Sequence, residues 1–295
     1  MKIPAAITGG VAAVLVLGLT SCGASEVRPD HGVTARLDRE NGQVVLPIED
    51  YAASQADEAV MTQARLAILR SCLQKSGHNG VKPPTSNAER AVEERPYGVW
   101  IVDRARAYGF DLPPAAETVE PAAPPGGWSD EADPAFNEAY EACSSEVMEQ
   151  MLAVSSPATS PGTTSVIADV TARARGLAAQ DPVWDEARDE WQQCLRDNGL
   201  TPVAEEGAVL SAESENLSDT RDAQGQTHSV KAEEIRLATI EATCNEQTRL
   251  TQRLGDLEAG YQAALIKKHE AALVEEKLVT AEHLEAARAY LARHQ

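Results

Sequence analysis

Apolar positions in the last part of the chain follow the period of a helix. Residues 229–295 contain no proline and consist mainly of Ala, Leu, Glu, Lys, Arg and Gln, the strongest helix formers. Apolar side chains recur there every three or four positions, as one stripe: Leu250, Leu254, Leu257, Tyr261 and Leu265. We therefore predict one long helix, about 90 Å long if straight. Gly255 and Gly260 are the positions where it would bend.

The same period predicts shorter helices upstream, over residues 56–76, 97–109, 133–154, 166–179 and 182–199. Gly77 and Gly199 stand where glycines close helices, and Asp181-Pro182 is a typical helix start. Polar or Pro/Ser/Gly-rich loops are expected at 111–128, 155–164 and 200–227. The pattern predicts an all-α, elongated protein.

Two parts of the chain carry a similar cysteine pattern. Cys72 and Cys194 each lie near the end of a predicted helix, and a glycine follows each of them five positions later. Cys143 and Cys244 each lie inside a later helix. We interpret this as a degenerate duplication, with a first half at 55–154, a linker at 155–164 and a second half at 165–295. Chance similarity of alanine-rich helices is the alternative.

The N-terminus has the pattern of a secretion signal. Lys2 is followed by an apolar run and then by Leu19-Thr20-Ser21-Cys22. These four residues resemble the lipobox of bacterial lipoproteins, in which a diacylglycerol is attached to the cysteine sulfur and cleavage makes that residue the first. We predict a signal peptide at 1–21, a lipid anchor on Cys22 and a flexible tether over 22–54, with a short ordered piece at 44–47. An ordinary secretory signal or a transmembrane anchor is the alternative, but the run is short for a full span.

The other four cysteines predict two disulfides, because an even number is typical of exported chains. The repeat favours Cys72–Cys143 and Cys194–Cys244, although the sequence leaves the other two pairings open. A zinc site is not expected, since no Cys-x2-Cys spacing occurs.

Composition narrows the class of partner. The net charge is −20, with 46 acidic and 26 basic residues. This balance argues against nucleic acid, which requires a basic footprint, and against lying flat on an anionic lipid surface. Aromatic residues make up only 4% of the chain, which fits alanine-rich helices with narrow apolar seams.

Motifs for catalysis are lacking. The sequence contains no Gly-x-Ser-x-Gly elbow, phosphate-binding loop or dinucleotide fingerprint, and Leu273 stands where a zinc-protease helix starting at His269 would need its second histidine. The acidic pairs Glu205-Glu206 and Glu233-Glu234 and the loop residue Trp128 are weak candidates for glycan chemistry. We predict no catalytic residue, no metal and no cofactor.

Several short motifs carry a family resemblance. Trp191-x2-Cys194-Leu195-x3-Gly199, Cys244-Asn245-Glu246-Gln247-Thr248 and Tyr108-Gly109-Phe110-Asp111-Leu112-Pro113 resemble segments of uncharacterised helical lipoproteins of high-GC Gram-positive (actinobacterial) bacteria. Leu195 stands where that family would have methionine. The resemblance implies a helical fold and a position on the outer face of the cytoplasmic membrane, and it brings no catalytic residues.

The function expected from the sequence is a non-enzymatic interaction or scaffold module, anchored to the membrane by its N-terminal lipid and bound to a protein partner in the cell envelope. A peptidoglycan- or glycan-acting enzyme or binding protein is one alternative, which would need a pocket with convergent carboxylates or aromatics. An accessory subunit of a membrane transporter is another, which would need an exposed apolar stripe.

Overall fold

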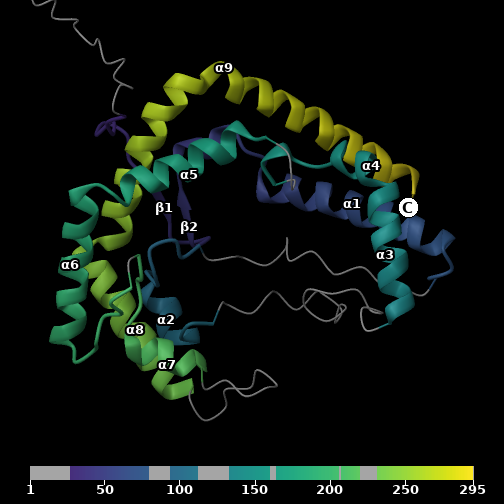
Figure 1. Cartoon of the computed structure of the whole chain (residues 1–295). Helices are drawn as coiled ribbons and strands as arrows, with labels where there is room; N and C mark the ends of the chain where they lie inside the picture. Colours follow the sequence, from purple (N-terminus) through teal and green to yellow (C-terminus); the bar gives the residue numbers. More distant parts are fainter. Residues whose placement is uncertain are drawn as a thin grey trace, which may run out of the picture.

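A computed structural model describes residues 27–79, 94–111, 133–159, 164–205, 207–219 and 231–294. This part of the chain is mainly helical, so the predicted all-α class is confirmed (Figure 1). The helices are α1 (Gln55–Lys75), α2 (Val102–Tyr108), α3 (Pro134–Glu146), α4 (Met148–Leu152), α5 (Val166–Ala178), α6 (Pro182–Asp197), α7 (Ala212–Asp219), α8 (Lys231–Thr248) and α9 (Leu250–Arg293). The other elements are the strands β1 (Arg36–Asp38) and β2 (Gln43–Val45) and the 3-10 turns η1 (Pro47–Asp50) and η3 (Pro157–Thr159). Helix α7 lies in the expected polar loop at 200–227.

Helices α1 and α6 close in the same way, as the cysteine repeat predicted. Gly77 and Gly199 have φ of 100° and 78°, a left-handed conformation that glycine adopts readily. Beyond each glycine the chain turns back, since the N–H of His78 donates to the Leu73 carbonyl and that of Leu200 to the Leu195 carbonyl. This is the hydrogen-bond pattern of a Schellman closure.

The predicted C-terminal helix is divided into α8 and α9 at Arg249. This residue has φ 56° and ψ 33°, a left-handed conformation that ends α8. Helix α9 is curved and runs continuously through Gly255 and Gly260 (Figure 1). A Cβ added at these positions would lie 3.0 Å from the Ala35 Cβ and 3.0 Å from the Asp30 carbonyl oxygen, respectively. The two glycines therefore allow the N-terminal segment to pack closely against α9. The helix is interrupted at Arg249 and not at the glycines, where a bend was expected.

The short ordered piece expected at 44–47 is confirmed, but the flexible tether expected around it is wrong for the rest of residues 27–54, which are also ordered against α9. Strands β1 and β2 form an antiparallel hairpin, and Val44 is 3% exposed. The N–H of Ile48 donates to the side-chain oxygen of Gln262 at 3.0 Å, and the N–H of Asp30 donates to the Gly260 carbonyl at 3.0 Å. The segment is ordered because α9 supplies apolar contacts and partners for its backbone.

The first residues of the expected linker at 155–164 are also packed in the fold, contrary to the prediction. Ser155 and Ser156 are only 3% and 2% exposed. The Ser155 carbonyl lies 2.7 Å from Nδ1 of His283 on α9. This stretch is therefore packed on the long helix.

Two main hydrophobic clusters lie at opposite ends of an arch that α9 spans (Figure 1). The first combines α5, α6, α8, the β hairpin, residues 97–101 and the first part of α9. The second combines α1, α3 and α4 with the last turns of α9. The predicted halves are therefore interleaved: α2, expected in the first half, packs on α8, and the end of α9, expected in the second, packs on α1.

Candidate functional site

The structure forms the two disulfides that the repeat favoured. Cys72–Cys143 joins the end of α1 to α3, and Cys194–Cys244 joins α6 to α8. Each lies beside one of the two clusters, with Cα–Cα distances of 5.7 and 5.6 Å. Cys22 lies outside the described residues.

Buried glutamates on α8 and α9 hold distant segments in place. Glu234, Glu241, Glu258 and Glu276 are between 1% and 8% exposed. Each carboxylate accepts hydrogen bonds from a segment far away in the sequence. Such bonds satisfy N–H and O–H groups that would otherwise be buried without partners.

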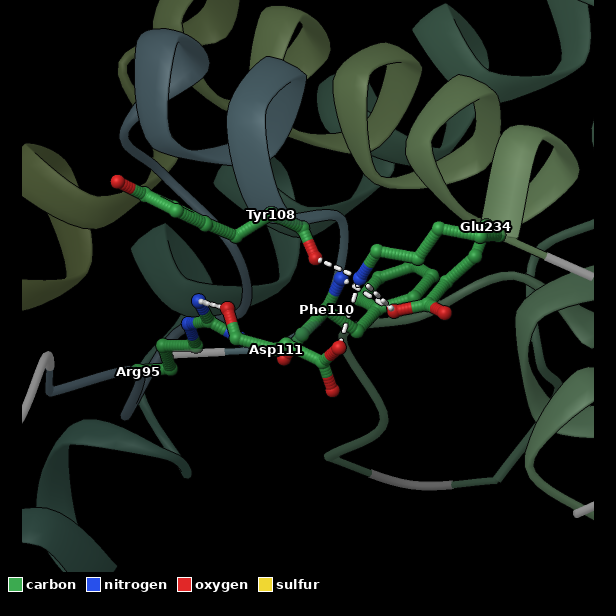
Figure 2. A network of polar contacts seen from close by, with 6 residues as sticks. Arg95, Tyr108, Phe110, Asp111 and Glu234 are labelled. Carbon is green, nitrogen blue, oxygen red and sulfur yellow. Dashed lines mark hydrogen bonds and ion pairs between the residues drawn. The ribbon is translucent and has the colours of Figure 1, made fainter. Parts of the chain in front are cut away.

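Glu234 fixes the Tyr-Gly-Phe element at the end of α2, residues 108–110 (Figure 2). Its Oε1 accepts the N–H of Phe110 at 3.0 Å. Gly109 has φ 69°, and a Cβ there would lie 2.8 Å from the same Oε1. The glycine is thus required by the close approach of the carboxylate. The two carboxylates of the predicted pair Glu233-Glu234 therefore have different partners, since Glu233 forms an ion pair with Arg236 at 2.7 Å.

Two cations, Lys231 and Arg95, complete this contact, and Figure 2 labels Arg95. Nζ of Lys231 donates to the Tyr108 carbonyl at 2.6 Å and to the Asp111 carboxylate at 2.7 Å. Arg95 donates to the Phe110 carbonyl at 2.6 Å. The motif singled out in the sequence therefore joins residues 94–111 to α8, and this role is structural.

Two of the other glutamates serve helix starts. Glu276 accepts from the Ser165 hydroxyl at 2.5 Å and the Val166 N–H at 2.6 Å at the start of α5. Glu241 accepts from the Ser211 N–H at 2.9 Å and the Ser214 hydroxyl at 2.6 Å at the start of α7. A carboxylate at a helix N-terminus also interacts favourably with the helix dipole.

Glu258 lies in the core between an aromatic hydroxyl and a cation. The Tyr97 hydroxyl donates to it at 2.7 Å, and Arg175 lies 3.7 Å away. Burial raises the pKa of Glu258 above its ordinary value, and the Tyr97 hydrogen bond and Arg175 oppose that rise. Burial also raises the pKa of Glu241, and it raises that of Tyr97 well above its usual range. Raised carboxyl pKa values often mark catalytic acids, but these carboxylates are engaged in the packing of segments.

The remaining sequence candidates are not brought together. His269 is half-buried on α9, Glu205 is exposed, and Trp128 lies outside the described residues. Two further tryptophans, Trp184 and Trp191 on α6, are buried in the first hydrophobic cluster. Among the residues that the structure describes, no group of three or more His, Cys, Asp or Glu side chains could hold a metal ion.

A pocket of about 130 Å³ opens where α8 meets α9, and we call it the junction pocket. It is lined by Leu37, Arg39, Trp100, Asn245, Glu246, Arg249, Thr251 and Gln252. Three segments converge there: the end of β1, the stretch before α2, and the α8–α9 junction.

Asn245 organises the floor of the junction pocket. Its Nδ2 donates to the Tyr97 carbonyl at 3.0 Å, and its Oδ1 accepts the N–H of Thr251 at 3.0 Å in the first turn of α9. Thr251 is 2% exposed, and its hydroxyl has no hydrogen-bond partner among the described residues.

The rim of the junction pocket is charged. Arg39 pairs with Glu246 at 2.9 Å, and its guanidinium lies over the Trp100 ring, 5.9 Å from the centroid. Arg249 is exposed, and in the described chain it is the one non-glycine residue with a positive φ. The rim thus carries two cations and one carboxylate.

Sequence reasoning missed this pocket. Asn245 and Glu246 belong to the Cys-Asn-Glu motif quoted for the family resemblance, which was the available signal. Arg39 was assigned to a flexible tether, and nothing in the local sequence indicated the left-handed conformation of Arg249.

Comparisons with known proteins identify no relative. Family models, curated proteins and solved structures all give no match to this chain. Within the described ranges, none of the helices combines the length and apolarity needed to cross a membrane. The resemblance to actinobacterial lipoproteins therefore stays a prediction.

Proposed function

We propose that this protein is a lipid-anchored, extracytoplasmic helical protein that acts as a non-enzymatic interaction module of the cell envelope. The observation that carries the proposal is the pair of disulfides, each joining helices of one cluster. Disulfides of this kind persist in oxidising compartments outside the cytoplasm. Together with the lipobox-like Leu19–Cys22, they support a position on the outer face of the cytoplasmic membrane.

The anchor would hold the folded part close to the lipid. The first described residue is Val27, five positions after Cys22. Five fully extended residues span at most about 18 Å. Because Asp30 is hydrogen-bonded to Gly260, the first third of α9 would lie close to the membrane surface.

Three features support binding over catalysis. The buried carboxylates on α8 and α9 accept hydrogen bonds that join segments of the fold. Val274 and Leu278 on α9 are 45% and 61% exposed, and their spacing of four places them on one face. An exposed apolar pair of this kind suits contact with a protein partner, either a scaffold component or a membrane transporter. Trp100 is only 2% exposed, so the junction pocket offers no open aromatic platform for a glycan.

Lipid attachment is tested by metabolic labelling with an alkyne fatty acid. The full chain should incorporate label and fractionate with membranes. Cys22→Ala should lose the label and either remain as precursor or appear in the medium, whereas Ser21→Ala, which keeps a small residue before the cysteine, should label normally. Normal labelling and membrane retention of Cys22→Ala would refute the anchor.

Catalysis is tested separately with a purified form that lacks the anchor. It should release no fragments from cell-wall glycans or peptides. Turnover that a single acidic substitution abolishes would favour the glycan-acting enzyme instead.

A further inference from the structure

We propose that the outer face of α9 binds a second copy of this chain, so that the protein forms an antiparallel dimer. The inference rests on the proposed interaction role and deepens it, because it names a partner for the exposed pair Val274 and Leu278. It does not depend on the lipid anchor. Three observations carry it: the spacing of the residues on this face, their exposure, and the distribution of their charges.

The outer face of the second half of α9 has the spacing of a coiled-coil seam. Steps of four and three residues alternate along it, and this alternation keeps the side chains in one line on a helix. The line is apolar in its centre and charged at both ends. We call it the outer stripe: Lys267, Ala271, Val274, Leu278, Ala281 and Glu285.

The outer stripe faces away from the rest of the fold. All of its residues are exposed. The opposite side of the same turns is buried, at Leu273, Glu276 and Thr280. Helices α1 and α5 pack against α9 on the concave side of the arch (Figure 1). A second helix can therefore approach the stripe without displacing any element that the structure describes.

The apolar centre of the stripe is unusual for this surface. Four large apolar side chains are exposed in the described part of the chain, and two of them, Val274 and Leu278, stand one helical turn apart here. They are 45% and 61% exposed. Single exposed apolar residues are ordinary on a protein surface, whereas adjacent ones on a regular seam favour a contact site.

Opposite charges mark the two ends of the stripe. Lys267 and its neighbour Lys268 lie at one end, and Glu282 and Glu285 lie at the other; all four are exposed. A parallel pair of copies would place lysines beside lysines and glutamates beside glutamates. An antiparallel pair brings the lysine end of each copy to the glutamate end of the other. Charges that flank a helical seam select the partner and its orientation in this way.

One antiparallel register matches the whole stripe. With the two-fold axis at the level of Glu276, Val274 of one copy packs against Leu278 of the other. Each contact occurs twice, because a two-fold interface uses the same surface on both copies. Small residues beside this contact allow the two helices to approach closely. Three further pairs form in the same register: Ala271 with Ala281, Lys267 with Glu285, and Lys268 with Glu282.

The length of the stripe limits the strength of the dimer. The stripe covers about 27 Å of helix. An interface of this length is smaller than the roughly 1,200–2,000 Å² of stable complexes. Both copies are acidic, and the two Glu275 side chains would lie near each other at the axis. We therefore expect a reversible dimer with a Kd in the micromolar to millimolar range.

Zero-length crosslinking of the full chain in detergent tests the register. A carbodiimide joins a lysine amine to a carboxylate only where the two are in contact. Lys268 and Glu282 lie about 21 Å apart along one helix, so a bond between them has to join two chains. We expect a covalent dimer in which mass spectrometry finds Lys267 or Lys268 joined to Glu282 or Glu285. Absence of a covalent dimer, or dimers joined only at other residues, would overturn the proposal.

Charge reversal tests the orientation. Lys267→Glu/Lys268→Glu and Glu282→Lys/Glu285→Lys each place like charges opposite one another at both ends of the antiparallel pair. Each variant alone should dimerise about tenfold more weakly than the parent chain at low ionic strength. An equimolar mixture of the two variants should recover the parent affinity, since every lysine end again meets a glutamate end.

Sedimentation equilibrium of the full chain in density-matched detergent measures these affinities. In a parallel pair the parent chain would already place like charges together, so it would dimerise no more tightly than either variant. That result, or a mixture no stronger than the separate variants, would contradict the antiparallel dimer.

An apolar substitution with a matched control tests the centre of the stripe. Leu278→Lys removes the same contact twice and should weaken the dimer by about tenfold or more. Val183→Lys on α6 is the control, because Val183 is 39% exposed and lies outside α9. It should change the affinity by less than about twofold. Both side chains are exposed, so both variants should remain folded.

Equal effects of these two substitutions would overturn the proposal, because the dimer would then not use the outer stripe. A chain that incorporates the lipid label and stays monomeric at all concentrations would refute the dimer and leave the proposed function in place. A dimer formed by a chain that carries no label would do the opposite for the anchor.

Discussion

The two glycines in the first third of α9 are packing positions. Gly260 lies against the backbone of Asp30 and the ring of Pro29, and Gly255 lies against Ala35. Both contacts bring the N-terminal segment close to the helix axis. Close packing therefore requires residues without a side chain at these two positions, although glycine is a poor helix former.

Gly260→Ala should destabilise the protein. Its Cβ would lie 3.0 Å from the Asp30 carbonyl oxygen and 3.1 Å from the Pro29 Cβ, so the segment would have to move. We expect a loss of about 1–3 kcal/mol in the free energy of unfolding, measured with urea. Gly176→Ala in α5 is the matched control, because its Cβ would meet nothing within 4 Å. That variant should gain about 0.5–1 kcal/mol. Equal effects of the two substitutions would contradict the packing role.

Glu258 should make stability depend on pH. Burial raises its pKa in the folded chain above the ordinary value of 4.5. As the pH rises from 4.5 through the folded pKa, the unfolded chain loses this proton first, so the contribution of Glu258 to stability falls. Below 4.5 both states are protonated and the contribution is constant.

Glu258→Gln should remove that part of the pH dependence. The amide stays neutral, and its oxygen can still accept from the Tyr97 hydroxyl. Urea unfolding at pH 4.5 and at neutral pH should show a smaller decline for the variant than for the parent chain. An unchanged difference between the two pH values would mean that Glu258 ionises in the fold as easily as in water.

At the level of elements, short segments depend on the long helices for their polar partners. Glu276 accepts hydrogen bonds from the start of α5, and Glu241 accepts them from the start of α7. Glu234 accepts one from Phe110, just after the end of α2. Isolated short helices are only marginally stable in water. These carboxylates on α8 and α9 therefore stabilise the starts and ends of the elements that pack on them.

Glu276→Gln tests this dependence. The substitution removes the charge from a group that accepts from the Ser165 hydroxyl and the N–H groups of Val166 and Ile167. We expect a loss of about 1–3 kcal/mol in unfolding free energy, because hydrogen bonds to charged groups are stronger than neutral ones. Glu275→Gln, on the exposed side of α9, should change it by less than about 0.5 kcal/mol. Faster amide exchange in the first turn of α5 should accompany the loss in Glu276→Gln. Exchange unchanged there would contradict the capping role.

Over the whole molecule, α9 connects two cores that are each crosslinked once. Cys72–Cys143 closes a loop with a sequence separation of 71 and Cys194–Cys244 one of 50. Loops of this size contribute about 4 kcal/mol each in the chain-entropy model. Removal of one disulfide should therefore loosen the cluster to which it belongs.

The double variant Cys194→Ser/Cys244→Ser should show faster hydrogen exchange in α6 and α8, with α1 and α3 protected. Cys72→Ser/Cys143→Ser should show the reverse. Exchange measured by mass spectrometry on both variants tests this. Equal loosening of both clusters by either variant would mean that α9 couples them into one cooperative unit.

Much of this architecture could be predicted from local signals. The helices follow from an apolar period of 3.6 residues, and the closures at Gly77 and Gly199 follow from a conformation that few other residues adopt. The repeat favoured the observed disulfide pairing but left the other two pairings open, and the structure decided between them. All these signals lie within a few residues of the feature they predict, or recur in both parts of the chain.

Only tertiary structure decided the rest. The segment at 27–54 is polar and contains little regular secondary structure. It is ordered by hydrogen bonds to Gln262 and Gly260 on α9, and local sequence could not predict these bonds because the partners are more than two hundred positions away. The division at Arg249 occurs within a run of helix formers, where Asn245 takes the N–H of Thr251 and Leu250 and Leu254 enter the core. The junction pocket combines residues from three such segments. Contacts between distant segments outweigh local propensity at these places, since propensity amounts to a few tenths of a kcal/mol per residue while burial of one large apolar side chain contributes about 1.5–3 kcal/mol.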